Sequence, residues 1–214
     1  MNVITRVEVS TPSAVFLQLG QLHVDLIHSG ILEVLGAAFV GTLYQELMRG
    51  AQTVIYVAFH EGQPIGFLVG TPNLNRSLRS IGVRGGARLL AAASCHLWRP
   101  RVLRAVILTL GYFFRRSPSA SPDVASVEAI ASTRAEVLAI AVSTEAQGRG
   151  IGKALVAAFE RDLHACGSSG RYFVSTNAEE VGSNAFYRTA GFNLMGQKPH
   201  HDLVLNIYAR DLPV

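Results

Sequence analysis

Residues 147–153, which read Gln-Gly-Arg-Gly-Ile-Gly-Lys, carry the clearest chemical signal in the chain. This glycine-rich run follows an apolar stretch at 136–142 and precedes a segment with helical periodicity. A strand, a glycine-rich turn and a helix start together form an anion site, because unpaired main-chain N–H groups and the positive end of the helix dipole converge there. Arg149 and Lys153 add positive charge, and the glycines let a bulky pyrophosphate approach the main chain.

The glycine spacing separates this turn from the two best-known phosphate-binding motifs. It lacks the G-x-x-x-x-G-K-[ST] pattern of the P-loop. Gly148 and Gly150 satisfy the first half of the dinucleotide pattern G-x-G-x-x-G, but Lys153 occupies the place of its last glycine. The run therefore predicts a pyrophosphate site of another class, the alternative being a tight turn that begins a helix and binds nothing.

A second motif lies about 35 residues further on, where 184–192 read Asn-Ala-Phe-Tyr-Arg-Thr-Ala-Gly-Phe. With it, the sequence resembles the GCN5-related N-acetyltransferase superfamily, whose first motif, Q/R-x-x-G-x-G/A, is matched by Gln147, Gly150 and Gly152. The resemblance is close over 135–209 and loose over 1–70. It implies a mixed α/β fold that uses acetyl-CoA as donor substrate and needs no metal.

The resemblance also implies where the coenzyme lies. Its pyrophosphate is expected on the amides of about 147–153, and its pantetheine arm beside the end of the strand at 140–142. An asparagine is usual seven residues before the family's tyrosine, but Glu180 stands there, so Asn177 or Asn184 is expected to replace it. The residues expected at the coenzyme are Ile140, Ala141, Val142, Gln147, Gly148, Arg149, Gly150, Ile151, Gly152, Lys153, Asn177 and Asn184.

Acetyl transfer to an amine sets three chemical demands: a base for the amine, a donor for the oxyanion and an acid for the departing thiolate. The resemblance assigns the acid to Tyr187, in the segment F-Y-x-x-x-G-F, the alternative being a phenol packed in the core. The main-chain N–H near Val142 is the expected oxyanion donor.

The general base is expected to be Glu136. It shares strand parity with Leu138, Ile140 and Val142, so its carboxylate would face the acceptor end of the cleft. A solvated residue at the strand end is the alternative. The histidines are weaker candidates: His23 and His28 on the first helix for an acceptor pocket, with a buried structural role as the commoner outcome, and His200 and His201 as exposed turn residues.

The elements that must position these residues follow from hydrophobic periodicity and turn chemistry. The expected fold is an α/β domain over 1–214 with a mixed central sheet flanked by helices, and a basic helical insertion at 71–122 between the third and fourth strands. Strands are predicted at 3–9, 53–59, 64–69, 136–142, 171–175, 192–195 and 203–209; helices are predicted from 13 to about 27, and at 33–48, 150–165 and 184–189.

The insertion carries most of the positive charge. No acidic residue lies between Glu61 and Asp123, whereas nine of the 19 basic residues do, giving +9 there and −5 (10 basic minus 15 acidic) elsewhere. Helices are predicted from Gly85-Gly86 to 98 and over 100–114. The arginines are Arg76, Arg79, Arg84, Arg88, Arg99, Arg101, Arg104, Arg115 and Arg116.

Four roles for the insertion stay open. Arginines suit an acceptor that bears phosphate or carboxylate, and a faint resemblance to arginine-rich acetyltransferases of bacterial surface-glycan pathways suggests a nucleotide-linked amino sugar. Arginines interleaved with apolar residues also suit peripheral contact with an anionic membrane, or a homodimer. The plainest role is two helices packed on the domain. Nucleic acid is not expected, because no reading motif accompanies the charge.

Composition sets the outer limits. With 49% apolar and 16% charged residues and a mean hydropathy of +0.29, the chain is not disordered, collagen-like or a disulfide scaffold. Two distant cysteines, no signal-peptide pattern and no run of about 20 apolar residues favour a cytoplasmic protein. The expected activity is direct acetyl transfer from acetyl-CoA to a primary amine of a small molecule; the alternative is a non-catalytic acyl-CoA sensor or a membrane-associated interaction protein.

Overall fold

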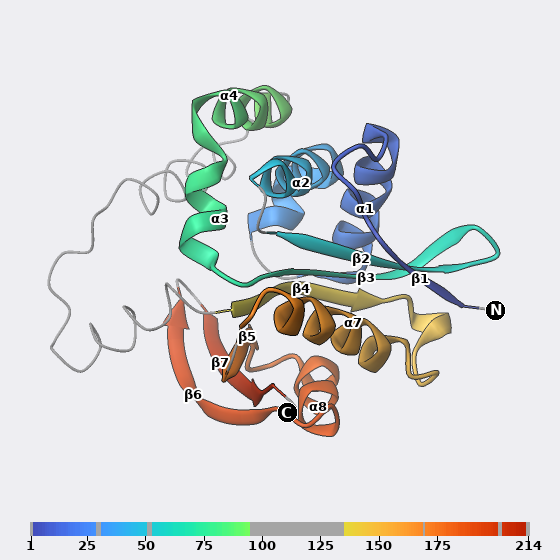
Figure 1. Ribbon diagram of the computed structural model, residues 1–214, viewed down its shortest axis with the longest axis vertical. Helices are drawn as coiled ribbons and strands as arrows, with labels where there is room; N and C mark the ends of the chain where they lie inside the picture. The colour runs from blue at the N-terminus through green and yellow to red at the C-terminus, as the bar shows by residue number, and fades with distance from the viewer. Residues whose placement is uncertain are drawn as a thin grey trace, which may run out of the picture. The chain divides into compact units, whose positions relative to one another are not determined.

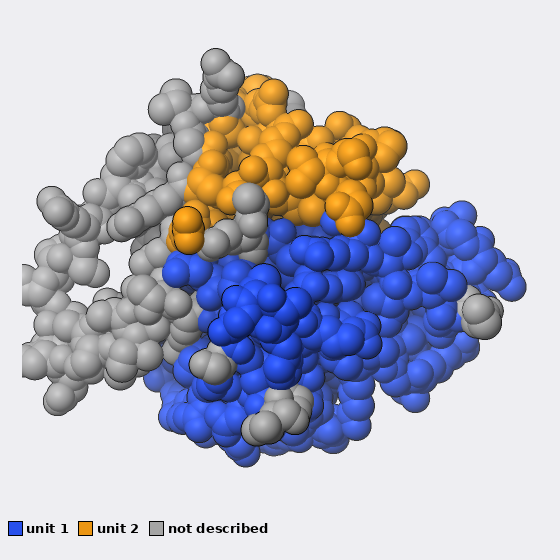
Figure 2. Space-filling view, viewed as in Figure 1, with its two compact units in different colours: residues 1–7, 52–74, 134–214 blue, residues 8–51, 75–133 orange. Residues whose placement is uncertain are grey.

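The structure, a computed structural model, describes residues 2–28, 31–50, 53–94, 135–168, 170–200 and 203–212. Its chain forms two compact units, which Figure 2 colours separately. Unit 1 comprises residues 1–7, 52–74 and 134–214, and unit 2 comprises 8–51 and 75–133. The two units are described in turn.

Unit 1 is built on a seven-stranded sheet with strand order β1-β2-β3-β4-β5-β7-β6 (Figure 1). Every neighbouring pair is antiparallel except β4 and β5, which are parallel. Mixed sheets of this kind need a crossover for the parallel pair, and α7 supplies it. The strands are β1 (Val3–Arg6), β2 (Val54–His60), β3 (Gln63–Thr71), β4 (Ala135–Val142), β5 (Arg171–Asn177), β6 (Asn193–His200) and β7 (Leu203–Asp211).

Two helices of unit 1, α7 (Ile151–Ala165) and α8 (Val181–Thr189), complete its core. On α7 the apolar residues Leu155, Phe159 and Leu163 recur at four-residue spacing, so they share one face, and all are at most 1% exposed. That face packs in one hydrophobic cluster with side chains from β2 to β5 and β7. Burial of this stripe, rather than helix propensity, fixes the helix that follows the glycine-rich turn.

The strands β4 and β5 pair over a short stretch only. Their register joins Ala135 to Tyr172 and ends at Val137, although β4 continues to Val142. Next to this point, β4 holds one extra residue: Val69 pairs with Ala139, whereas Gly70 pairs with Val137. Leu138 is therefore a bulge residue, and bulges bend the strand that carries them. The far end of β4 is left without a partner on its β5 side.

Unit 2 contains α1 (Ser13–Leu26), α2 (Ile31–Arg49), most of α3 (Leu74–Ser80) and α4 (Gly82–Ala93). The helices α1 and α2 pack closely, and a buried hydrogen bond of 2.6 Å joins His23 Nδ1 to the Tyr44 hydroxyl between them. The helix α4 is held on α2 by an ion pair of 2.9 Å between Arg88 Nη1 and the buried Glu46 Oε1. Arg49 binds the same carboxylate oxygen.

The predicted elements agree with the structure in kind and order, and the mixed sheet flanked by helices is confirmed. The insertion differs in detail, because α3 was not predicted and α4 begins at Gly82, with Gly85 and Gly86 inside it. The expected helix at 184–189 begins at Val181. The expected helix at 100–114 lies outside the described residues. No helix in the described ranges is long and apolar enough to cross a membrane.

Candidate active site

The glycine-rich turn has the geometry that an anion site needs. After a short 3₁₀ turn at Thr144–Ala146, Gly148 and Gly150 have φ angles of 74° and 76°, values that side-chain-bearing residues rarely adopt. A Cβ atom at either position would meet nothing within 4 Å, so the space beside the turn is open. No side chain caps α7. The amides of its first turn are therefore available to a ligand.

Gln147 shapes this turn through its side chain. Its Nε2 donates a hydrogen bond of 3.0 Å to the main-chain carbonyl of Val142, across the loop that joins β4 to α7. The side chain therefore closes the loop. Sequence reasoning placed Gln147 at the coenzyme, and the structure gives it a local role in holding the turn that would bind one.

Gly152 is a glycine for a different reason from its two neighbours. A Cβ atom there would lie 2.8 Å from the ring of Phe186 on α8. The first turn of α7 thus packs directly on α8, and a side chain at 152 would require the Phe186 ring to shift. Gly148 and Gly150 thus border open space where a pyrophosphate is expected, whereas Gly152 makes room for the ring of Phe186.

The unpaired end of β4 offers main-chain groups to a ligand. Ser143 N donates to Ile65 O at 2.8 Å, which fixes the alternation of the antiparallel ladder with β3. By that alternation, the main-chain groups of Ile140 and Val142 point away from β3, toward the side on which β4 no longer pairs with β5. The Val142 carbonyl is used by Gln147, and its N–H faces the gap. An extended chain such as pantetheine can pair with this edge as an added strand would.

Tyr187 is a packed aromatic residue. It is 6% exposed, and its ring lies 5.3 to 5.5 Å from the rings of Phe186, Phe192 and Tyr208. Burial raises the pKa of its phenol well above the usual 10, so the hydroxyl keeps its proton at neutral pH. No hydrogen bond joins that hydroxyl to another of the described residues. The side chain is thus packed in the core and retains a proton to donate.

Glu136 was expected to share a face of β4 with Leu138, Ile140 and Val142. For Ile140 and Val142 this expectation is wrong. The bulge at Leu138 reverses the alternation, so Ile140 and Val142 pack on the α7 side with Val137, while Glu136 faces the other way. Glu136 pairs with Thr71 on β3 and with Phe173 on β5, and it is half-buried.

Asn184 was expected at the coenzyme, but its hydrogen-bonding groups serve the protein interior. Its amide nitrogen donates to the carbonyls of Asn177, Ala178 and Glu180 at 2.7 to 3.3 Å. Its Oδ1 accepts hydrogen bonds of 2.7 Å from Asn206 Nδ2 and 2.9 Å from the Tyr208 hydroxyl. A side-chain amide has two donors and one acceptor oxygen with two lone pairs, so none is left for a ligand.

The other asparagine expected at the coenzyme, Asn177, is half-buried at the end of β5. Its Oδ1 accepts a hydrogen bond of 3.1 Å from Glu179 N, which forms the turn into α8. Arg149 and Lys153 are both exposed.

The histidines that were weaker candidates for an acceptor pocket differ in burial. His23 is 4% exposed and bonded to Tyr44, and burial lowers its pKa to about 4. His28 is exposed, and His201 lies outside the described residues. Within the described ranges, no group of three or more His, Cys, Asp or Glu side chains could hold a metal ion.

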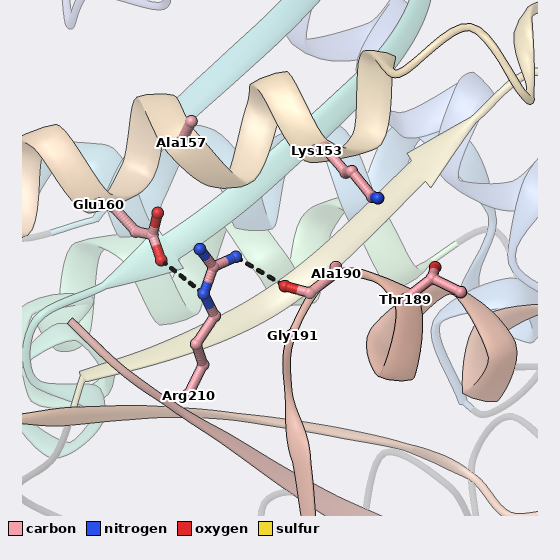
Figure 3. Close-up of a pocket in the computed structure, with 7 residues that line it drawn as sticks. All are labelled: Lys153, Ala157, Glu160, Thr189, Ala190, Gly191 and Arg210. Carbon is pink, nitrogen blue, oxygen red and sulfur yellow. Dashed lines mark hydrogen bonds and ion pairs between the residues drawn. The ribbon is translucent and has the colours of Figure 1, made fainter. Parts of the chain in front are cut away.

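A pocket that the sequence did not suggest lies on unit 1 beside α7 (Figure 3). It has a volume of about 340 Å³. We call it the α7–α8 pocket. Its walls are Lys153, Ala157 and Glu160 of α7, Thr189, Ala190 and Gly191 at the end of α8, and Arg210 of β7. Of its lining residues, only Lys153 was predicted to bind a ligand. Glu160 and Arg210 are 50 residues apart in the sequence, so no local pattern joins them.

Comparison with known proteins agrees with this geometry. The model of the acetyltransferase (GNAT) family matches residues 32–192. A search of curated proteins found no match.

Solved structures with the same fold include the ribosomal-protein-S18-alanine N-acetyltransferase of Escherichia coli, at 13% identity, a TM-score of 0.57, and coverage of 100% of this chain and 96% of that one. An N-acetyltransferase of Staphylococcus aureus matches at 14% identity and a TM-score of 0.56, covering 100% of this chain and 99% of that one. An acetyltransferase of Streptococcus pneumoniae matches at 10% identity and a TM-score of 0.55, with both chains covered completely. The glycine-rich turn, the parted strands and the family match over three quarters of the sequence lead to one conclusion: the chain belongs to the acetyltransferase (GNAT) family.

Proposed function

We propose that the protein transfers the acetyl group of acetyl-CoA directly to a primary amine of a small-molecule acceptor, with both substrates bound at once. Membership of the family makes it an acetyl-CoA-dependent N-acetyltransferase. The acceptor class, the direct route and the catalytic residues are the proposal. The observation that carries it is the open glycine-rich turn next to an unpaired strand end, which is a shape suited to a pyrophosphate and an extended arm.

The residues present fit the coenzyme at two places. The free amides at the start of α7, with the exposed Arg149 and Lys153, would hold the pyrophosphate. The unpaired main-chain groups of Ile140 would hydrogen-bond the pantetheine arm, and the Val142 N–H would lie beyond them at its thioester end. Bound acetyl-CoA supplies an activated thioester. Asn177 stays a proposed contact, whereas Asn184 has no group left to make one.

Three groups of the chain would carry the chemistry. Glu136 would accept a proton from the ammonium form of the acceptor, directly or through one water, leaving a neutral amine as nucleophile. The Val142 N–H would donate to the oxygen that becomes negative when the amine attacks the thioester carbonyl. Tyr187 would give its phenolic proton to the sulfur that leaves as the C–S bond breaks, and the proton that the nitrogen then loses would return through water to the Tyr187 phenolate. The products would be an amide and a free thiol.

The acceptor is proposed to be anionic, such as a nucleotide-linked amino sugar, because of the insertion's charge. Not all of that charge is available. Arg88 is paired with Glu46 inside unit 2, so it holds the insertion in place and does not await a ligand. The arginines that would recognise phosphate or carboxylate are therefore sought among the others of 71–122. Peripheral membrane contact and a homodimer through the same segment are the competing roles.

The test is thiol release from acetyl-CoA with a panel of amines that includes nucleotide-linked amino sugars, amino acids and polyamines. We expect release that depends on the amine, fastest with an anionic one. Gly150→Glu should abolish coenzyme binding, because it places a carboxylate and a strained backbone in the pyrophosphate site. Gly167→Glu is the matched control: it has a similar φ, of 71°, and lies beyond the end of α7. Coenzyme binding without turnover on any amine would indicate a sensor instead.

A further inference from the structure

The α7–α8 pocket gathers charged groups that the transfer chemistry does not use. Arg210 is held in place by three contacts: its Nε pairs with Glu160 Oε1 at 3.2 Å, its Nη1 donates to the Ala190 carbonyl at 2.7 Å, and its guanidinium carbon lies 5.9 Å from the centre of the Phe192 ring. The Tyr172 hydroxyl donates to the same Glu160 oxygen at 2.7 Å. Figure 3 shows the guanidinium between Glu160 and the end of α8. A buried carboxylate thus fixes the orientation of an arginine at the pocket wall.

Two cationic donors remain open in this pocket. The Nη2 group of Arg210 has no partner among the described residues, and neither has the ammonium group of Lys153. Glu160 is 6% exposed and its charge is offset by Arg210, so Lys153 gives the pocket a net positive charge. A preorganised guanidinium and an ammonium group suit a phosphate, which accepts several charge-assisted hydrogen bonds.

The position of the pocket connects it to the coenzyme. Lys153 is the third residue of α7, so it belongs both to the first turn, where the pyrophosphate would bind, and to the pocket wall. Ala157 and Glu160 follow on the same helix face, with Glu160 about 10 Å beyond Lys153 along the axis. Coenzyme A carries a third phosphate, on the 3′ position of the ribose next to its pyrophosphate. A volume of about 340 Å³ holds a phosphate and part of a nucleoside.

We propose that the α7–α8 pocket binds the 3′-phosphate of coenzyme A through Lys153 and Arg210, and so selects coenzyme A over its 3′-dephospho form. This inference rests on the proposed function, because it takes the pyrophosphate to lie at the start of α7. It adds a specificity site, formed by residues of α7 and by Arg210 of β7, to the donor-binding turn.

The test measures the dissociation constants of coenzyme A and 3′-dephospho-coenzyme A for the full chain by titration calorimetry. We expect the wild type to bind coenzyme A roughly tenfold more tightly, since one charge-assisted hydrogen bond accounts for a preference of that size. Lys153→Met should reduce this ratio to near one. Arg161→Met removes a charge from an exposed site on the same helix outside the pocket, and should keep it.

Arg210 needs a separate design, because its removal strands the buried Glu160 carboxylate. The double variant Arg210→Gln, Glu160→Gln removes both charges and should also lose the preference. A wild-type ratio near one, or a ratio unchanged in both variants, would overturn the inference while leaving the proposed function intact. Failure of the wild type to bind either compound would instead contradict the proposed function.

Competition with inorganic phosphate and with adenosine 3′,5′-bisphosphate distinguishes a site for the 3′-phosphate of coenzyme A from a site for a free phosphate ion. If the pocket serves the coenzyme, the bisphosphate should compete with coenzyme A, and Lys153→Met should weaken that competition. Inorganic phosphate that binds through Lys153 without displacing coenzyme A would show a separate anion site and would overturn the assignment to the 3′-phosphate.

Discussion

The side chain of Gln147 donates a hydrogen bond of 3.0 Å to the main-chain carbonyl of Val142, five residues earlier. One contact thereby joins the end of the parted strand to the turn that starts α7. The two proposed halves of the donor site, the edge for the pantetheine arm and the amides for the pyrophosphate, are held at a fixed separation by it. We therefore expect loss of this hydrogen bond to weaken coenzyme binding more than it slows the chemical step.

Gln147→Met tests this directly, because the substitution keeps the length of the side chain and removes the donor without adding a negative charge to the turn. We expect the KM for acetyl-CoA to rise about three- to tenfold, matching a net hydrogen-bond contribution of about 1 kcal/mol, with kcat nearly unchanged. Gln63→Met, at an exposed strand start, makes the same chemical change away from the turn and should leave both constants as they are. A fall in kcat alone would contradict the positioning role.

Tyr187→Phe removes the proposed acid and keeps the packed ring. We expect kcat to fall about a hundredfold, at the lower end of general acid catalysis, with the affinity for coenzyme A unchanged. Because burial raises the pKa of this phenol, Tyr187 stays protonated through pH 9, and no loss of kcat below that pH should come from its ionisation. A fully active variant would show that the thiolate leaves without this acid.

Asn184→Ala distinguishes a coenzyme ligand from an interior tether. Its removal leaves buried carbonyls and donors without partners, so we expect the free energy of unfolding to fall by about 3 kcal/mol. Denaturant unfolding measures this. Coenzyme affinity of the folded fraction should be retained. A large loss of affinity with unchanged stability would restore Asn184 to the donor site.

The His23–Tyr44 pair predicts a loss of stability in acid. The pKa of His23 is about 4 in the folded chain against 6.5 unfolded, so the unfolded state takes up a proton first as the pH falls. Stability from this group is complete above pH 6.5 and is lost as the pH falls toward 4, by up to about 3 kcal/mol. His23→Gln should show a shallower dependence over that interval in denaturant unfolding.

The ion pair between Arg88 and Glu46 changes how the insertion should be tested. Deleting 72–120 removes Arg88 and leaves Glu46 with Arg49 as its remaining partner, so we expect lower stability whatever the insertion does. Replacing arginines of 99–116 by glutamine should instead lower acceptor affinity or liposome binding with the melting temperature kept. Unchanged acceptor kinetics together with unchanged liposome binding would exclude both the acceptor and the membrane roles.

Local patterns carried the prediction of the fold and of the turn. Apolar periodicity gave the order of strands and helices, and the glycine spacing located the turn, because both depend on neighbouring residues. Glu136 was predicted to share a face with Ile140 and Val142. That was wrong because the bulge at Leu138 reverses the alternation, and a pattern of period two does not reveal a bulge. The internal hydrogen bonds of Asn184 could not be predicted locally, because two of its partners, Asn206 and Tyr208, are over 20 residues away.

The α7–α8 pocket was missed for a similar reason. Glu160 and Arg210 read separately as a helix residue and a strand residue, and only the fold brings their charges to 3.2 Å. Contacts that join distant segments follow from tertiary packing, which a single sequence read by local pattern does not supply.

The edge of β4 that faces the gap is made of peptide groups, which every residue type other than proline provides in full. A donor site of this kind makes few demands on side-chain identity beyond the glycines of the turn. Sequences can therefore diverge until only 10 to 14% of residues agree, as between this chain and the three solved structures, while the fold is kept. If the proposed function is right, the acceptor can change through segments such as the arginine-rich insertion while the main-chain edge that would bind the donor stays the same.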